Sequence, residues 1–181
     1  MTKTVYIGSG AGFAGDRLDA AIPVVETLRT CDGPRYLIFE VMGERTLAIA
    51  QRIKMRNPDK GYSPYLDEYL RGVLKACKEN GVRIVSNLGN ANPLGGAKRV
   101  HELAAELGIE NLRVACVHGD DLLTFMDADE IGALPTIEGL EITGKEIVAA
   151  NAYIGARPVA EALALDVDVV LVGRTTDAAL V

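Results

Sequence analysis

Polar side chains capable of chemistry follow directly after several apolar runs that are candidate β-strands. Those that could act on or bind a ligand are Ser9, Asp16, Glu40, Arg45, Asn87, Asn90, Asn92, His118, Asp120, Arg174 and Asp177. In a parallel sheet all strand C-termini share one edge, and ligands bind in the crevice along that edge. We therefore expect these side chains to converge on one ligand site.

Three of these residues are candidates for proton transfer. Glu40 emerges from the apolar run Tyr36–Phe39, so it is the carboxylate that we expect to be most desolvated and best suited to general acid or base catalysis. His118 is the only histidine at a strand end, and Asp120 lies two residues after it. Imidazole can accept or release a proton near neutral pH. We predict Glu40, Asp120 and His118 as the catalytic group.

The remaining polar residues suggest binding of an anion or a carbonyl. Arg174 could hold a carboxylate or phosphate through two hydrogen bonds. The amides of Asn87, Asn90 and Asn92 could bind an oxyanion or a carbonyl oxygen. Local explanations stay open, since Asn92 before Pro93 also suits a helix cap.

The stretch from Gly8 to Asp16 carries four glycines after an apolar run. Glycine lets backbone N–H groups approach a ligand closely where a strand turns into a helix. Gly10, Gly12 and Gly15 match the spacing G-x-G-x-x-G, which is typical of dinucleotide sites. The motif begins two residues after the strand-end glycine Gly8, so its register is shifted.

Three interpretations of this stretch stay open. The first is a nicotinamide or flavin site, although the charge of Asp16 would repel a pyrophosphate. The second is another anionic or carbonyl ligand bound by Gly8, Ser9, Gly10 and Gly12. The third is a structural turn, with Asp16 capping a helix that begins near Arg17.

Composition and missing motifs exclude several function classes. The net charge is −6 without a basic block, which argues against a nucleic-acid or membrane-surface partner. No Gly-x-Ser-x-Gly elbow occurs, so the sequence does not indicate a hydrolase with a serine nucleophile. No Gly-Lys-Ser/Thr loop occurs, which argues against a nucleoside triphosphate site. Glu40, Asp120 and Asp121 could bind a divalent cation, but they lack the spacing of a ligand motif. We predict no metal site and no resident cofactor, with NAD(P) as the alternative.

The cysteines and the first residues indicate a compartment. Three widely separated cysteines are most simply explained as reduced thiols. No apolar run typical of a signal peptide precedes Asp16. We therefore expect a cytoplasmic protein.

Hydrophobic periodicity alternates between strand and helix along the whole chain. The predicted strands are Lys3–Ile7, Arg35–Val41, Val82–Ser86, Leu112–Val117 and Val167–Val172. The predicted helices are Arg17–Arg29, Glu44–Arg56, Pro64–Asn80, Leu94–Leu107 and Arg157–Leu165. This order indicates a single α/β domain over residues 1–181, with an open, mostly parallel, doubly wound (Rossmann-like) sheet of about five strands.

The last residues suggest that the domain continues. Thr176 and the segment Asp177–Val181 open a helix that does not complete a second turn. We expect either a longer domain, of which this is the N-terminal part, or cover from a partner chain.

Several strings resemble one protein family, the AtuA (acyclic terpene utilisation) family. They are Ile7–Arg17, Phe39-Glu40 with Glu44-Arg45-Thr46, Asn87-x-Gly-x-Ala-Asn92-Pro93, Gly119-Asp120-Asp121, Asn151–Ala156 and Gly173-Arg174-x-Thr176-Asp177. They run through the whole chain in the family's order. The resemblance implies a role beside acyl-CoA carboxylases, hydratases and dehydrogenases in bacterial catabolism of branched acyclic acids. Family members are longer, which implies that this chain is the N-terminal portion.

The residues and the resemblance together favour a catabolic enzyme that acts on an acyl-CoA or a related carboxylic acid. Glu40 would transfer a proton next to the carbonyl, as in hydration, dehydration or hydrolysis, and Arg174 would anchor an anionic group. Two rival hypotheses are an NAD(P)-dependent oxidoreductase and a non-catalytic ligand-binding subunit completed by a partner chain. We expect a homo-oligomer or completion by a further chain.

Overall fold

A computed structural model describes residues 4–181, so Lys3, the predicted start of the first strand, lies outside the described residues. Five strands form one open sheet in the order β1-β2-β3-β5-β4, and every pairing is parallel. The strands are β1 (Tyr6–Ala11), β2 (Arg35–Phe39), β3 (Val82–Ser86), β4 (Val114–Val117) and β5 (Val169–Val172). The predicted parallel α/β sheet is confirmed.

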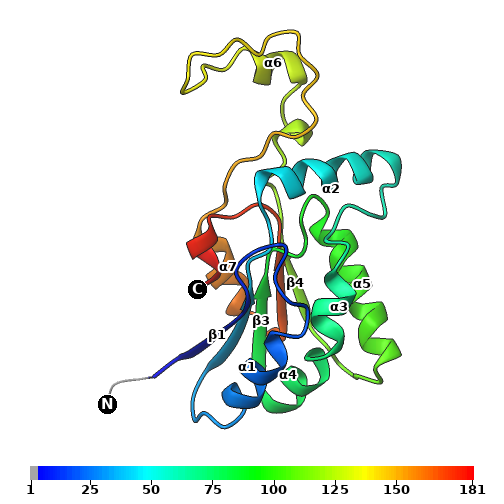
Figure 1. Ribbon diagram of the computed structural model, residues 1–181, viewed down its shortest axis with the longest axis vertical. Helices are drawn as coiled ribbons and strands as arrows, with labels where there is room; N and C mark the ends of the chain where they lie inside the picture. Colours follow the sequence, from blue (N-terminus) through cyan, green and yellow to red (C-terminus); the bar gives the residue numbers. More distant parts are fainter. Residues whose placement is uncertain (1–3) are drawn as a thin grey trace.

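Helices cover the sheet unequally (Figure 1). The helices are α1 (Ala21–Leu28), α2 (Glu44–Arg56), α3 (Leu66–Arg71), α4 (Leu74–Asn80), α5 (Pro93–Glu106), α6 (Ala128–Gly132) and α7 (Ala156–Leu163), with 3₁₀ turns at Leu122–Thr124 and Asp177–Leu180. Helices α1, α3, α4 and α5 share one core with the sheet, whereas α7 packs on the other face. Helix α2 lies across the C-terminal edge of the strands, and α6 sits on an arm that projects from the body.

Two cores hold the sheet in place. The larger contains Leu37 and Phe39 of β2, and the Phe39 ring lies 5.5 Å from the ring of Tyr69 on α3. The smaller lies under α7, with Val170 and Val172 at its centre. All four residues of β5 are buried, because this interior strand lies between β3 and β4 and is covered on both faces.

Three predicted elements differ from the structure. The first strand does not end at Ile7 but continues through the glycines to Ala11. Helix α1 begins at Ala21 rather than near Arg17, and Pro23 falls in its first turn, where proline is tolerated. The predicted helix Pro64–Asn80 is two helices, because the backbone leaves helical geometry at Val73, with φ −130°.

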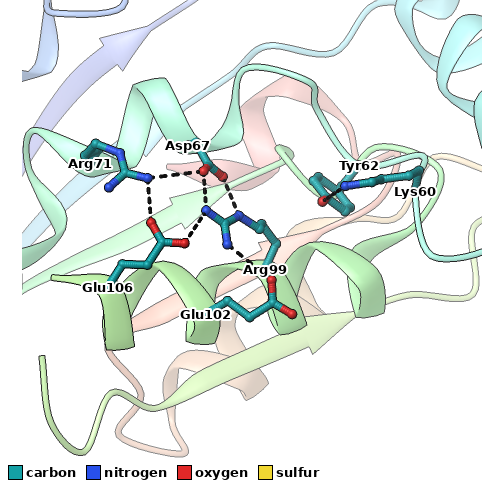
Figure 2. A network of polar contacts seen from close by, with 7 residues as sticks. All are labelled: Lys60, Tyr62, Asp67, Arg71, Arg99, Glu102 and Glu106. Carbon is teal, nitrogen blue, oxygen red and sulfur yellow. Dashed lines mark hydrogen bonds and ion pairs between the residues drawn. The ribbon is translucent and has the colours of Figure 1, made fainter. Parts of the chain in front are cut away.

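A network of charged side chains ties α3 to α5 on the surface (Figure 2). Arg99 Nε donates to Asp67 Oδ1 at 2.8 Å, and its Nη2 lies 2.8 Å from Glu106 Oε1. Arg71 pairs with the same two carboxylates. The hydrogen bond from Arg99 is the main cause that lowers the pKa of Asp67. This network fixes the helices that back the main core.

Within residues 4–181, no helix is long and apolar enough to cross a bilayer.

Candidate functional site

Glu40 and Asn87 meet at the C-terminal edge of the sheet, where β2 and β3 end. Glu40 Oε1 accepts hydrogen bonds from Asn87 Nδ2 at 2.7 Å and from the backbone N–H of Met42 at 3.2 Å. Asn87 Oδ1 accepts from the backbone N–H of Val41 at 2.9 Å. Two donors on one oxygen fix the orientation of the carboxylate.

A cavity of about 490 Å³ opens beside Glu40. Its walls are the loop after β1, the segment that enters α2 and the end of β5, contributed by Phe13, Ala14, Gly15, Glu40, Met42, Gly43, Glu44, Arg45, Thr46, Arg174 and Asp177. Four residues predicted from the sequence, Glu40, Arg45, Arg174 and Asp177, therefore line one cavity. We call it the polar cavity.

Arg174 is largely occupied by contacts within the protein. Its side chain is 3% exposed, Nη1 donates to the Met42 carbonyl at 2.6 Å, and Nη2 pairs with Asp177. The guanidinium lies 4.2 Å above the ring of Tyr153, a favourable cation–π arrangement. Arg174 thus joins the end of β5 to the segment that follows β2.

Tyr153 contacts two residues of the cavity wall, Glu44 and Arg174, and the sequence marked it only as part of the family string Asn151–Ala156. Its hydroxyl donates to Glu44, and this hydrogen bond is the main cause that lowers the pKa of Glu44 and raises the pKa of Tyr153. The segment around Tyr153 has no clear periodicity, so no predicted strand end pointed to it. Glu44 did stand out as a first-turn residue of a helix, but its place in the cavity wall depends on the tertiary fold.

Arg45, unlike Arg174, has no side-chain partner among the described residues. It is an exposed residue in the wall of the polar cavity. Within the described chain its side chain makes neither an ion pair nor a hydrogen bond with another residue. Its guanidinium is therefore available to a negatively charged ligand.

The other two predicted catalytic residues lie in a separate hollow of about 210 Å³, together with Asn92. Asp120 is 3% exposed, and its Oδ2 accepts from the backbone N–H of Arg174 at 2.9 Å and from Asn151 at 2.8 Å. Asn92 caps α5 by accepting from Gly95 N at 3.0 Å. The structure thus places His118 and Asp120 apart from the cavity that holds Glu40.

The glycine stretch does not form the strand–turn–helix junction of a dinucleotide site. Gly8, Ser9 and Gly10 lie inside β1, and a Cβ on Gly10 would stand 2.5 Å from the ring of Phe39. These glycines allow β1 to pack closely against its neighbours. The turn predicted at Gly8 is wrong, because the strand continues to Ala11.

Asp16 does not cap α1, contrary to the prediction. Its carboxylate accepts from Gly12 N at 2.8 Å and closes the loop after β1, whereas the residue before α1 is Ala20.

The cysteines and metal-ligating side chains add no further chemistry to this edge. Burial raises the pKa of the Cys77 thiol to about 12 and that of Cys116 to about 11, so neither is an activated nucleophile. The described part of the chain holds no group of three or more His, Cys, Asp or Glu residues that could bind a metal ion.

The family of the chain is shown by its sequence. Neither a curated protein nor a solved structure matches it. Residues 5–181 match the model of the family described as acyclic terpene utilisation family protein AtuA, which is essentially the whole chain. The protein therefore belongs to the AtuA family.

Proposed function

We propose that the protein is an enzyme that binds a carboxylic acid or its acyl thioester and transfers a proton at the carbon next to the carbonyl. The observation that carries this proposal is the polar cavity, whose wall holds both the oriented carboxylate of Glu40 and the unpaired guanidinium of Arg45. A base beside a cation suits chemistry in which negative charge develops on a carbonyl oxygen.

Each residue has a defined part in this reaction. Glu40 Oε1 is engaged by Asn87 and Met42, so Oε2 is the atom that accepts the proton. The electron pair of the broken C–H bond moves onto the carbonyl oxygen, where the positive charge of Arg45 stabilises it. Asn87 is a positioning residue, because its amide is committed to Glu40 and Val41. Dehydration of a 3-hydroxyacyl compound begins with this proton transfer and hydration ends with its reverse, whereas hydrolysis would use only the stabilisation of the carbonyl oxygen.

Solvent exchange at the α-carbon tests the proposal. The protein in D₂O would be given carboxylic acids from acetate to octanoate and their CoA thioesters, and deuterium incorporation would be followed by proton NMR. Changing Glu40→Gln should slow exchange by about 100-fold or more while ligand binding persists, since general-base catalysis contributes about that much. Glu26→Gln is a matched control, because Glu26 is exposed on α1 and, among residues 4–181, pairs only with Arg29.

One outcome would count against Glu40, and two others would point to the rival functions. An unchanged exchange rate in Glu40→Gln would remove Glu40 from the mechanism. Binding without exchange in the unaltered protein would favour the non-catalytic ligand-binding subunit. Thermal stabilisation by NAD(P) alone would favour the oxidoreductase. In the structure Gly8 and Gly10 lie within β1, whereas Gly12 and Gly15 lie in the loop between β1 and α1.

A further inference from the structure

We propose that the protein holds the hydrocarbon chain of its ligand in an apolar chamber next to the polar cavity, and that Ala50 limits the length of that chain. This inference rests on the proposed function, because the head of the ligand is the carboxyl group in the polar cavity. The chamber has a volume of about 180 Å³. Its walls are Ala14, Val41, Thr46, Ile49, Ala50, Ile53, Ser63, Pro64, Tyr65 and Asn90. Ala14 and Thr46 line both spaces, so the two spaces adjoin.

The face of α2 toward the chamber has the pattern of a helix that packs on a core. Thr46, Ile49, Ala50 and Ile53 follow the spacing i, i+3, i+4, i+7, which places them on one side of the helix. Such an apolar face is normally covered by other side chains. Here Ile49 and Ile53 remain 49% and 37% exposed beside the chamber. An aliphatic chain in the chamber would complete this packing.

Asn90 is a buried polar residue in the wall of the chamber. Two other polar residues of the wall have partners, since Thr46 Oγ1 bonds to Gly43 and Ser63 Oγ accepts from Tyr65 N. Asn90 is only 3% exposed, and its Oδ1 has no hydrogen-bond partner among the described residues. Its φ of 44° is also unusual for a residue other than glycine. An aliphatic chain cannot hydrogen-bond to Oδ1, so the inference rests on the volume of the chamber, the apolar face of α2 and the wall shared with the polar cavity.

The size of the chamber limits the chain that it can hold. A dry apolar cavity of about 150 Å³ accommodates one benzene molecule. A volume of about 180 Å³ therefore suits roughly six carbon atoms. The ligand class is an aliphatic carboxylic acid, or its thioester, with the carboxyl group near Glu40 and Arg45. Each methylene that enters the chamber should strengthen binding about fourfold.

Titration calorimetry with straight-chain carboxylates from acetate to decanoate tests the chamber. We expect the affinity to rise about fourfold per methylene and to level off once the chamber is full. Ala50→Leu should move that plateau to chains shorter by about three carbons, because the added side-chain atoms occupy the chamber. Ala48→Leu is the matched control, since Ala48 is on the same helix but outside the lining, and it should leave the plateau in place.

A second variant covers the case in which Ala50→Leu does not fold. Ile53→Ala enlarges the chamber and should move the plateau to longer chains. Carboxylates that bind with an affinity independent of chain length would overturn the chamber while leaving the proposed function intact. A plateau that responds to Ala50 or Ile53 in a protein without α-carbon exchange would support the chamber although the proposed function fails.

Neutral ligands separate the chamber from the polar cavity. If no carboxylate binds, 1-alkanols of the same lengths test the chamber alone. A plateau that shifts in Ala50→Leu would then support the inference, and its absence would overturn it.

Discussion

Arg45 and Arg174 line the same cavity and carry the same charge, but their surroundings give them different roles. Arg174 is buried, stacks on Tyr153 and bonds to the Met42 carbonyl and to Asp177. Arg45 makes no side-chain contact of this kind within the described residues and is exposed. Arg174 therefore stabilises the structure of the site, whereas the guanidinium of Arg45 is available to bind a ligand.

Two alanine variants separate these roles. Arg45→Ala should change the free energy of unfolding by less than about 0.5 kcal/mol, as at ordinary surface positions. It should weaken hexanoate binding about tenfold, the typical loss for a hydrogen bond to a charged group. Arg174→Ala should destabilise the fold by about 2–3 kcal/mol, because a buried carbonyl and a stacked ring lose their partner. Denaturant unfolding and titration calorimetry measure both effects, and unaltered binding in Arg45→Ala would place the anion elsewhere.

Residue types in the sequence predicted what the side chains at this edge can bond to, but not which partners they choose. Asn87 and Asp120 were predicted to face a ligand. In the structure the hydrogen bonds of Asn87 go to Glu40 and Val41, and those of Asp120 go to Asn151 and the backbone of Arg174. These partners come from distant parts of the chain, so local spacing cannot identify them.

At the level of single elements, the strand β1 and its glycines show why a motif can mislead. A Cβ on Gly10 would meet the ring of Phe39 on β2 and the side chain of Ala21 on α1, whereas a Cβ on Gly12 would meet nothing within 4 Å. Gly10→Ala should therefore destabilise the protein by about 1–3 kcal/mol through overpacking. Gly12→Ala should leave the free energy of unfolding within about 0.5 kcal/mol of the original. Equal effects at both positions in thermal or denaturant unfolding would contradict this packing role.

The surface network between α3 and α5 makes stability depend on pH. The pKa of Asp67 is lowered in the folded protein, chiefly by the hydrogen bond from Arg99. The network therefore stabilises the fold above the unfolded pKa of about 4, and this contribution is lost as the pH falls through the lower folded value. Its size should be about 1 kcal/mol, because the groups are partly exposed to solvent.

Comparison with Asp67→Asn isolates this contribution. The difference in free energy of unfolding between the two proteins should be present at pH 7 and shrink below about pH 4. A difference that stays constant across this range would show that the carboxylate charge does not stabilise the helix pair.

An element could be predicted when its bounds depend on the local sequence pattern, and not when they depend on contacts with distant residues. The bounds of α2 and β3 follow from their own periodicity and agree with the structure. The predicted bounds of β1 and α1 were wrong, because the glycines of β1 are required by contacts with Val24 and Phe39. The linear sequence pattern does not contain these contacts. Residues 122–146 have no clear periodicity, and the structure places a 3₁₀ turn, the short helix α6 and the projecting arm there (Figure 1).

For the molecule as a whole, alternating strands and helices were enough to predict a parallel sheet, and the proposed ligand site lies at the C-terminal edge of its strands. They did not predict that this edge holds three separate spaces, which are the polar cavity, the apolar chamber and the hollow around His118. That division arises because α2 lies across the edge. Its position depends on contacts such as those of Asp121 with Gln51 and Lys54.

The central claim is that the ligand binds between the loop after β1 and the start of α2. Mapping backbone amide NMR shifts during titration with hexanoate tests it most directly. We predict that the largest changes occur at Gly15, Gly43 and Thr46, which line the polar cavity. Changes concentrated instead at Gly8 or at Gly119, which line other hollows, would contradict the claim.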